Sequence, residues 1–232
     1  MKKKLVALTG AGISAESGIK TFRDSDGLWE GFDVMKVATP SGWEQNPELV
    51  LDFYNQRRRQ LIQCNPNKAH LALAELEEFY SVEIITQNVD DLHERAGSSN
   101  ILHLHGELLK VRSTKDINLI YACTDDINLD SKCELGSQLR PHIVWFGEDV
   151  PNLEKAIKST IQADVLLVVG TSLQVYPAAG LVAYAPRDIM LYYIDPKPAP
   201  NLEMMRIKNL KIIPKVASEG MQDVLRILQT IL

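Results

Sequence analysis

The sequence predicts an α/β protein built on a doubly wound, mostly parallel β-sheet. Short runs of β-branched residues alternate along the chain with segments of helical periodicity, a pattern typical of right-handed βαβ units. The run Leu166-Leu167-Val168-Val169 is apolar on both faces, as expected of a central strand that helices cover on both sides. With 232 residues, the chain has room for one domain that carries a small insert.

The expected strands and helices follow this alternation. Strands are expected over residues 4–9, 82–87, 101–105, 142–146, 164–169, 190–195 and 210–215. A helix is expected over 47–64, because Asn46 caps its first turn, Pro47 fits the first position and Glu48 favours the positive end of the dipole. Further helices are expected over 68–80 and 219–232. Residues 17–46 and 108–140 interrupt the rhythm, and we expect these two insertions to build a small second lobe within a single domain of residues 1–232.

Composition and charge argue against several classes of protein. The net charge is −5 and basic residues cluster only in the short runs Lys2-Lys3-Lys4 and Arg57-Arg58-Arg59, so no direct nucleic-acid partner is expected. No stretch reaches the roughly 18 to 20 apolar residues that span a bilayer, so no membrane association is expected. The cysteines Cys64, Cys123 and Cys133 are scattered and odd in number, which argues against a disulfide framework and favours the reducing cytoplasm. We expect a monomer there.

A glycine-rich turn follows the first expected strand. Gly10, Ala11, Gly12 and Ala15 fit the G-x-G-x-x-G/A fingerprint of a Rossmann-like fold, in which glycines permit a tight turn and let backbone N–H groups approach a pyrophosphate. The alternative is a strand-to-helix turn that binds no ligand. A dehydrogenase would carry an acidic residue about 20 positions later at the end of the second strand. Residues 24–29 do not look like such a strand end, which argues against a dehydrogenase.

Polar residues also follow later strands of the expected sheet. Ligands in open α/β sheets bind at the carboxyl ends of the strands, so these groups are expected to face one crevice. The groups are Gln87, Asn88 and Asp90 after one strand, Gly170, Thr171 and Ser172 after another, and Asp195 after a third. The amides would suit a carboxamide such as that of nicotinamide. The alternatives are helix capping by Asn88 or Asp90 and a turn that Asp195 starts before Pro196.

His105 stands at a strand end, directly before Gly106. Alternation with a period of two places His103 and His105 on one face of the strand. A histidine at such a position is a candidate general base, because its ordinary pKa of about 6.5 lies near neutrality. The alternative is a structural histidine.

Taken together, these motifs resemble the sirtuins, the NAD-dependent protein lysine deacylases. The resemblance rests on the run from Gly10 to Ile19, and on Thr21-Phe22-Arg23, Gln87-Asn88-Val89-Asp90, His105-Gly106, Trp145-Phe146-Gly147-Glu148 and Gly170-Thr171-Ser172, which occur in the family's order. It implies NAD as the cofactor and acylated lysine in proteins or peptides as the substrate. It also implies that the acyl group passes to ADP-ribose while nicotinamide leaves.

The resemblance assigns a role to each motif. His105 would be the general base, with Asn88 and Asp90 as further catalytic residues. The cofactor would be held by residues at the strand ends and in the following loops: Gly10, Ala11, Gly12, Ala15, Glu16, Phe22, Arg23, Gln87, Asn88, Asp90, Gly170, Thr171, Ser172, Asp195 and Ala217. Val144, Phe146 and Gly147 would pair through the backbone with an extended substrate peptide.

The detailed likeness is to class III sirtuins of the bacterial CobB type. Tyr54 and Arg57 form the Tyr-x-x-Arg pair of that class, and positions three apart share one face of a helix. A phenol O–H and a guanidinium group together can hold a carboxylate, which suits succinyl or malonyl groups, and the small Ala38 would leave room for a longer acyl chain. The alternative for the pair is core packing and a solvated basic face, the role expected of Arg58 and Arg59.

The sequence departs from the family in two places. Most sirtuins bind structural zinc through two Cys-x-x-Cys pairs in the small lobe. This chain has none, and Ser113 stands where a first cysteine is expected. Cys123 and Cys133 provide at most two of the four ligands of a closed zinc site, so no metal is expected. The family often has Asn at the position of Asp195, whose carboxylate would repel a 2′-phosphate and so favours NAD over NADP.

We therefore expect an NAD-dependent deacylase that removes acetyl, succinyl and malonyl groups. The alternative is a non-catalytic module that binds NAD or ADP-ribose, and the presence of Asn88, Asp90 and His105 argues against it.

Overall fold

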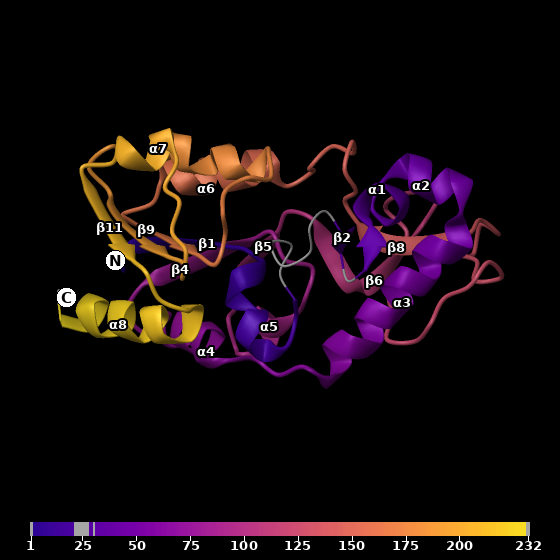
Figure 1. Cartoon of the computed structure of the whole chain (residues 1–232), viewed down its shortest axis with the longest axis horizontal. Helices are drawn as coiled ribbons and strands as arrows, with labels where there is room; N and C mark the ends of the chain where they lie inside the picture. Colours follow the sequence, from indigo (N-terminus) through magenta and orange to yellow (C-terminus); the bar gives the residue numbers. More distant parts are fainter. Residues whose placement is uncertain (1, 21–27, 30, 231–232) are drawn as a thin grey trace.

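The computed structural model describes residues 2–20, 28–29 and 31–230, which form two lobes joined side by side (Figure 1). The large lobe is built on a six-stranded sheet in the order β11-β10-β9-β1-β4-β5, in which every neighbouring pair is parallel. Its strands are β1 (Lys4–Thr9), β4 (Ser81–Thr86), β5 (Ile101–His103), β9 (Val165–Val169), β10 (Met190–Ile194) and β11 (Asn209–Ile213). The predicted fold class, a doubly wound parallel α/β sheet, is confirmed.

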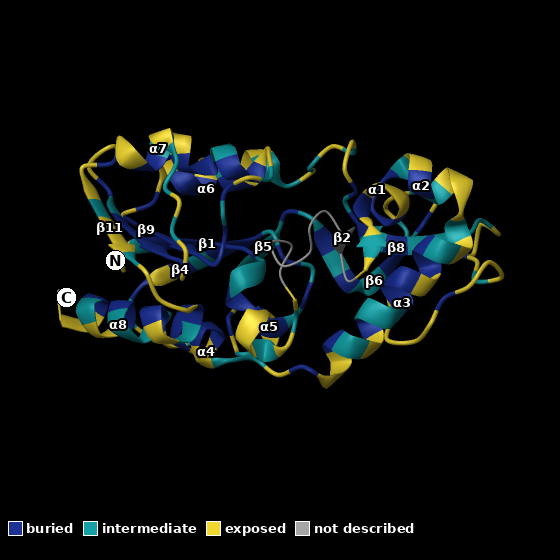
Figure 2. Cartoon of the chain, in the orientation of Figure 1, coloured by how far each residue is buried: buried dark blue, intermediate teal, exposed yellow. Residues whose placement is uncertain are grey.

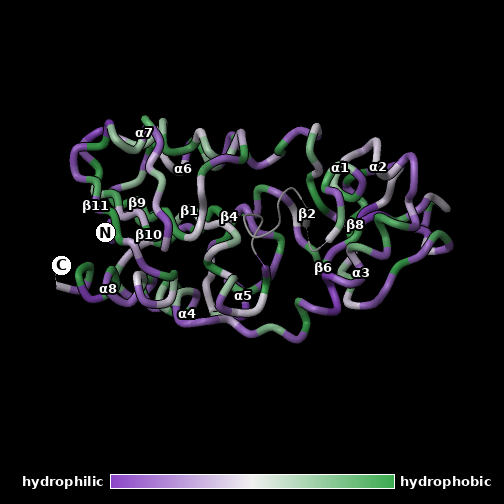
Figure 3. The backbone as a smooth tube through the Cα atoms, viewed as in Figure 1, coloured by the Kyte–Doolittle hydropathy of each residue, from purple (hydrophilic) through white to green (hydrophobic). Residues whose placement is uncertain are grey.

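Helices cover both faces of this sheet, and its central strands are buried (Figure 2). Side chains alternate between the two faces: Leu5 and Ala7 pack against α4 (Lys68–Leu76) and α8 (Ala217–Thr230), whereas Val6 and Leu8 point to the other face. That second face is covered by α6 (Leu153–Ile161), the 3₁₀ helix η4 (Ala178–Tyr184) and α7 (Leu202–Met205). Figure 3 shows hydrophobic stretches along the central strands and mixed hydropathy along the helices, as two-sided burial requires.

The small lobe surrounds a three-stranded antiparallel sheet in the order β7-β6-β8. Its strands and helices are β2 (Leu28–Trp29), β3 (Phe32–Asp33), α1 (Val34–Val37), α2 (Pro40–Gln45), α3 (Pro47–Gln63), β6 (Gly106–Ser113), β7 (Ile120–Ala122) and β8 (Leu139–Ile143). Helix α3 begins as the sequence predicts, because the side chain of Asn46 accepts a hydrogen bond from the Leu49 N–H and Pro47 occupies the first position. Phe53, Tyr54 and Trp145 are fully or almost fully buried in the core of this lobe.

Arg58 corrects one expectation. We expected its side chain on a solvated face, but it is fully buried. Its guanidinium group donates to the carbonyl oxygens of Leu108 and Asp125 and to the Asn55 side chain, at 2.8 to 3.2 Å. Arg59 is exposed as expected and pairs with Asp126. Arg58 thus joins α3 to β6 and to the loop after β7, which stabilises the small lobe.

The residues of the small lobe do not fit a closed zinc site. Ser113, Cys133 and Ser137 come together, with 2.8 Å between the two serine Oγ atoms and 3.1 and 3.4 Å from the Cys133 Sγ to these oxygens. Cys123 donates instead to the carbonyl of Asp125. One thiol and two hydroxyl groups do not supply the four thiolate or imidazole ligands of a structural zinc ion, and hydrogen bonds hold this cluster together.

Several elements differ from the sequence expectation. The strand expected over 142–146 is β8, which lies three residues earlier and belongs to the small sheet. It ends at Ile143 because the next amides bond elsewhere: Val144 N–H to the His105 carbonyl and Phe146 N–H to the Ala38 carbonyl. Helix α4 ends at Leu76 rather than at residue 80, and α6 and η4 were not predicted. None of the helices that the structure describes combines the length and the apolar character needed to span a bilayer.

Candidate active site

The carboxyl ends of four central strands lie in one row. In the sheet register Thr9 is opposite Thr86 and Val169, and Val169 is opposite Ile194. The residues that follow each strand therefore meet at one edge. These are the predicted residues Gly10, Ala11, Gly12, Ala15, Gln87, Asn88, Asp90, Gly170, Thr171, Ser172 and Asp195, which the structure brings to this edge.

The glycines of the first turn are explained by close packing of two loops. Gly12 N–H donates to the Gly170 carbonyl at 2.8 Å, and a Cβ atom on Gly12 would lie 2.7 Å from the Gly170 Cα. Gly170 itself has a φ of +61°, and its Cβ atom would lie 2.2 Å from the Ile13 nitrogen. These glycines permit direct backbone contact between the loops after β1 and β9. The Gly12 N–H is used within the protein rather than left for a pyrophosphate.

A polar network behind this turn centres on Ser14, which is fully buried in the short 3₁₀ turns after β1. The Ser14 Oγ donates to the Asp90 carboxylate at 3.0 Å and accepts from the Asn88 side-chain amide at 3.1 Å. His70 lies behind it, with its Nε2 3.4 Å from the same Oγ. Since His70 Nδ1 accepts the Asn67 N–H, Nε2 carries the proton and donates to Ser14.

Burial shifts the pKa values in this network. Burial raises the pKa of the Asp90 carboxyl, although hydrogen bonds from Leu92 N–H and Ser14 oppose the shift. Burial, with a smaller contribution from the charge of Arg95, lowers the pKa of His70 to about 4, so this imidazole is neutral near pH 7. The network is thus a fixed array of donors and acceptors.

His105 is held in one tautomer at the same edge. Its Nδ1 lies 2.9 Å from the Gln87 carbonyl, which only accepts, so Nδ1 carries the proton and Nε2 keeps its lone pair. Burial lowers the pKa of His105, and the hydrogen bond to Gln87 opposes the shift only in part. The next residue, Gly106, has a φ of +85°, and a Cβ atom on it would lie 2.1 Å from the His142 carbonyl oxygen. The geometry therefore presents a neutral imidazole with Nε2 as a proton acceptor.

Gln87, Thr171 and Asp195 complete the row of strand ends. The Gln87 side chain donates to the Thr171 Oγ1 at 3.0 Å, which joins the loops after β4 and β9. Asp195 is buried, and its carboxylate accepts the Lys197 N–H at 2.8 Å. The turn role that we considered for Asp195 is thus present in the structure, and the side chain still lies at the carboxyl edge of the sheet.

Glu16 and Ala217 lie beside one another at the start of α8. The Glu16 carboxylate accepts the Ser218 N–H and O–H at 2.9 and 2.6 Å, and Ala217 is the buried first residue of the helix. This contact anchors the turn after β1 to the helix N-terminus. Phe22 and Arg23, which we assigned to the cofactor loop, lie outside the described residues.

A pocket lies between this edge and helix α3. It has a volume of about 50 Å³ and is lined by Ile19, Lys20, Tyr54, Arg57, Gln60, Leu61, Val89, Asp90 and Leu108. Both members of the predicted Tyr-x-x-Arg pair therefore face the same cavity as Asp90. Burial raises the pKa of Tyr54, which stays protonated, and the Arg57 guanidinium lies 5.2 Å from the centre of the Phe53 ring.

Trp145 joins the segment after β8 to Tyr54, one of the residues that line the pocket. The Trp145 Nε1 donates to the Tyr54 hydroxyl at 3.0 Å, and its ring stacks on the Arg140 guanidinium. The Glu148 carboxylate accepts from both the Trp145 N–H and Arg140, at 2.8 and 2.7 Å, which fixes the turn. Three predicted substrate residues lie on this segment: the half-buried Val144 and the exposed Phe146 and Gly147. A fourth, the buried Ala38 after α1, accepts the Phe146 N–H at 2.9 Å through its carbonyl.

Sequence reasoning missed the roles of Ser14 and His70. Ser14 is a buried polar residue in an otherwise apolar turn, and the pattern Asn67-x-x-His70 is that of a capping box, in which His70 bonds back to the Asn67 N–H. The capping signal was readable in the sequence. The contact between His70 and Ser14, 56 positions apart, was not.

Comparison with known proteins agrees with this geometry. The family model described as "Sir2 family" matches residues 10–177. A protein named NAD-dependent protein deacylase from Helicobacter pylori is 63% identical over 223 residues, 96% of each chain. A protein of the same name from Bacteroides thetaiotaomicron is 50% identical, over 97% of this chain and 98% of the relative.

Solved structures give the same result. The crystal structure of a Sir2 homologue in complex with NAD superposes with a TM-score of 0.87 and 42% identity, covering 99% of this chain and 91% of that one. A mutant Sir2 homologue in complex with ADP-ribose gives a TM-score of 0.88 and 41% identity, covering 99% and 93%. These matches confirm the resemblance that the motifs predicted: the chain belongs to the Sir2 family.

Proposed function

We propose that this protein is an NAD-dependent protein lysine deacylase, which releases nicotinamide and transfers the acyl group of a modified lysine to ADP-ribose. The observation that carries the proposal is the position of His105. Its Nε2 lone pair is kept available by the hydrogen bond from Nδ1 to the Gln87 carbonyl, at the same strand ends as Asn88 and Asp90. The deacylase relatives and the NAD and ADP-ribose complexes of Sir2 homologues support the same activity.

The residues at the strand ends fit NAD as the second substrate. Amide and carboxylate groups of Gln87, Asn88 and Asp90 are fixed at one edge, and the Asp195 carboxylate at the end of β10 suits a ribose hydroxyl. A carboxylate at this position would repel a 2′-phosphate, which favours NAD over NADP. When bound, NAD supplies the ADP-ribosyl group and a leaving group, nicotinamide.

In this proposal the protein performs two tasks, positioning and proton transfer. His105 Nε2 accepts the proton of a ribose hydroxyl, which is possible near neutral pH because burial keeps the imidazole unprotonated. Asn88 and Asp90 hold the ribose and nicotinamide region, and Ser14 fixes the side chains of both. Glu16 and Ala217, together with Phe22 and Arg23, complete the proposed cofactor site.

The pocket beside Asp90 supports removal of acyl groups that end in a carboxylate. Tyr54 keeps its proton and Arg57 is cationic, so together they can hold a carboxylate by charge-assisted hydrogen bonds. Lys20 lines the same cavity and adds a second positive charge. We therefore propose desuccinylase and demalonylase activity in addition to deacetylase activity.

The segment after β8 is the proposed peptide-binding edge. Three of its amides are already bonded within the protein: Val144 to His105, Trp145 to Glu148 and Phe146 to Ala38. A substrate peptide that adds a strand here would therefore donate its own N–H groups to the carbonyl groups of Val144, Phe146 and Gly147. Of the backbone pairing that the sequence suggested, these three positions therefore provide carbonyl acceptors for the substrate peptide.

We also propose that the protein works as a cytoplasmic monomer without a nucleic-acid or membrane partner. Light scattering coupled to size-exclusion chromatography tests the monomer directly, since a mass well above 26.0 kDa would contradict it.

The function is tested by mass spectrometry of acyl-lysine peptides incubated with the protein, with and without NAD. We expect NAD-dependent loss of the acyl group together with nicotinamide and O-acyl-ADP-ribose, and turnover lowered at least about a hundredfold in a His105→Ala variant that still binds NAD. Binding of NAD without turnover by the wild-type protein would favour the non-catalytic module. Turnover by His105→Ala at the wild-type rate would contradict the role of His105.

A further inference from the structure

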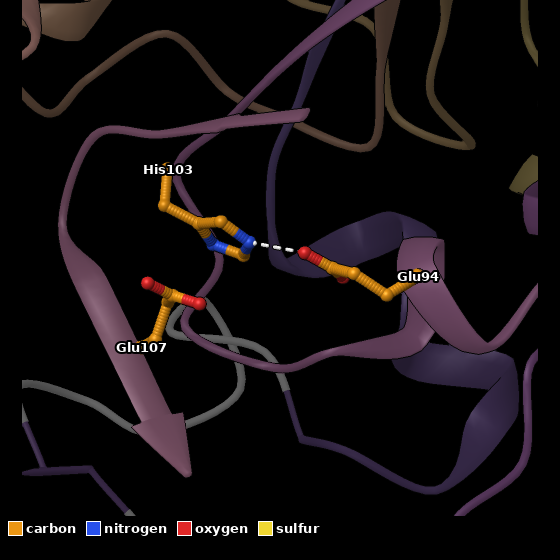
Figure 4. A group of neighbouring side chains, drawn as sticks. All are labelled: Glu94, His103 and Glu107. Atoms are coloured by element: carbon orange, nitrogen blue, oxygen red, sulfur yellow. Dashed lines mark hydrogen bonds and ion pairs between the residues drawn. The ribbon is translucent and has the colours of Figure 1, made fainter. Parts of the chain in front are cut away.

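Three side chains that could bind a metal lie close together (Figure 4). They are Glu94 on α5 (Leu92–Arg95), His103 at the end of β5 and Glu107 on β6. One potential ligand atom from each lies within 4.8 Å of the other two, and among the described residues no other group of three His, Cys, Asp or Glu side chains meets this condition. Neither the proposed reaction nor the zinc site typical of the family uses these residues.

His103 is oriented as a metal-binding histidine usually is. Its Nδ1 lies 3.2 Å from the Asn88 carbonyl, which only accepts, so Nδ1 carries a proton and Nε2 points away from the protein backbone. A backbone carbonyl that binds the far nitrogen is a common second contact of metal-ligating histidines, because it fixes the ring and its tautomer. The side chain of His103 is only 9% exposed, so the ring is held in place.

A positive charge must lie between the His103 Nε2 and the Glu94 carboxylate. The Glu94 Oε1 lies 2.8 Å from Nε2, and a lone pair on each atom would repel the other. Either a proton or a metal ion must therefore lie between them. A Glu107 carboxylate oxygen lies within 4.8 Å of a ring nitrogen of His103 and of a Glu94 oxygen, so the three side chains offer one imidazole and two carboxylates, whose charge balances that of a divalent ion.

We propose that Glu94, His103 and Glu107 form a binding site for one Zn²⁺ ion, with water as the fourth ligand. One imidazole and two carboxylates with an open position match the ligand types and number of accessible zinc sites. Tetrahedral ligands at about 2.0–2.1 Å from zinc lie roughly 3.3 Å apart, so the gap between Nε2 and Oε1 needs to widen by about half an ångström. Glu94, whose side chain is 40% exposed, has the freedom to make this adjustment.

Lys110 competes for this site. Its ammonium group pairs with the Glu107 Oε2 at 2.7 Å, and its side chain is 42% exposed. A metal ion must displace it from Glu107, and solvent can take up the released ammonium group. Zinc binding is therefore expected to tighten when the lysine charge is removed, whereas binding to carboxylates elsewhere on the surface would not change.

Calorimetric titration of tag-free full-length protein with ZnCl₂ tests the proposal. We expect one ion per chain, binding at least about tenfold weaker in Glu107→Gln and about a hundredfold weaker in His103→Gln, and severalfold tighter binding in Lys110→Gln. The control is Glu154→Gln, which removes an exposed carboxylate on α6 that is not part of the cluster and should leave the affinity unchanged.

X-ray absorption at the zinc edge identifies the ligands independently of how well each variant folds. Nitrogen and oxygen neighbours at about 2.0–2.1 Å are expected. Sulfur neighbours at about 2.3 Å would place the ion on a cysteine and overturn the assignment. The absence of saturable binding to the wild-type protein, or equal affinity in wild type and His103→Gln, would overturn it as well.

Discussion

The indole Nε1 of Trp145 donates a hydrogen bond of 3.0 Å to the hydroxyl of Tyr54, and both side chains are buried. This bond joins helix α3, which carries Arg57, to the segment proposed to bind the substrate peptide. It orients the Tyr54 hydroxyl at the wall of the pocket.

A double-mutant cycle measures this bond. Tyr54→Phe leaves the Trp145 N–H without its acceptor, so the free energy of unfolding should fall by about 1–3 kcal/mol. Combining it with Trp145→Phe should give a coupling energy of about 1 kcal/mol in denaturant titrations. Strict additivity of the two substitutions would mean that the bond does not contribute to stability.

Arg58 and Arg59 provide a matched pair for stability. Arg58→Met orphans the carbonyl of the buried Leu108, removes the bond to the Asp125 carbonyl and should lower the free energy of unfolding by about 2–4 kcal/mol. Arg59→Met removes only an exposed ion pair with Asp126 and should cost less than about 1 kcal/mol. Urea unfolding of the two variants checks the prediction. Similar decreases in the free energy of unfolding would show that the buried bonds of Arg58 do not stabilise the protein more than the exposed ion pair of Arg59.

His70 makes stability dependent on pH in the acid range. Its pKa is about 4 in the folded protein and near 6.5 in the unfolded chain, so between these values only the unfolded chain takes up the proton. Protonation of His70 therefore does not lower the free energy of unfolding above about pH 6.5, and lowers it progressively as the pH falls from there towards 4. From pH 7 to pH 5 this amounts to about 2 kcal/mol.

His70→Gln keeps a donor for Ser14 but does not titrate. In urea titrations at pH 7 and pH 5, the variant should lose about 2 kcal/mol less stability than the wild-type protein over the same interval. Other buried histidines remain in both proteins, so only the difference between the two losses of stability reports on His70. An equal loss in the variant would contradict the assignment to His70.

His105 predicts the shape of the pH–rate profile. Burial lowers its pKa below the ordinary value of about 6.5, so kcat/KM for deacylation should be level from about pH 7 to pH 8 as far as this group is concerned. The rate should fall only below about pH 6.5. His105→Ala should lower kcat by roughly 10² to 10⁴-fold and abolish the acid limb. An acid limb centred above pH 7 would be incompatible with a buried, neutral His105.

Much of the fold and the row of site residues could be predicted because they depend on local patterns. The bounds of β1 match the expected residues 4–9, and the carboxyl ends of parallel strands necessarily meet at one edge. This rule alone predicts that Gly10, Gln87 and Asp195 lie at the same edge of the sheet, without knowledge of the strand order.

The rest depends on contacts between distant parts of the chain. In the sequence Arg58 resembles Arg59, a residue of a solvated basic face, and its burial is decided by carbonyl groups 50 and 67 positions away. The link from His70 to Ser14 and the bond from Trp145 to Tyr54 are of the same kind. The use of the Gly12 N–H by Gly170 was likewise hidden, because the fingerprint alone does not say whether a ligand or a second loop approaches the glycine.

The central claim is that an acyl pocket with a carboxylate-binding pair adjoins a deacylase site, and one ratio tests it most directly. This ratio is kcat/KM for a succinyl-lysine peptide divided by that for the matched acetyl-lysine peptide, with NAD, in the wild-type protein, Arg57→Met and the control Arg59→Met. We predict that Arg57→Met lowers the ratio at least about tenfold, because the succinyl carboxylate loses a charge-assisted hydrogen bond. Arg59→Met should leave the ratio unchanged. An unchanged ratio in Arg57→Met, or equal loss of both activities, would contradict the account.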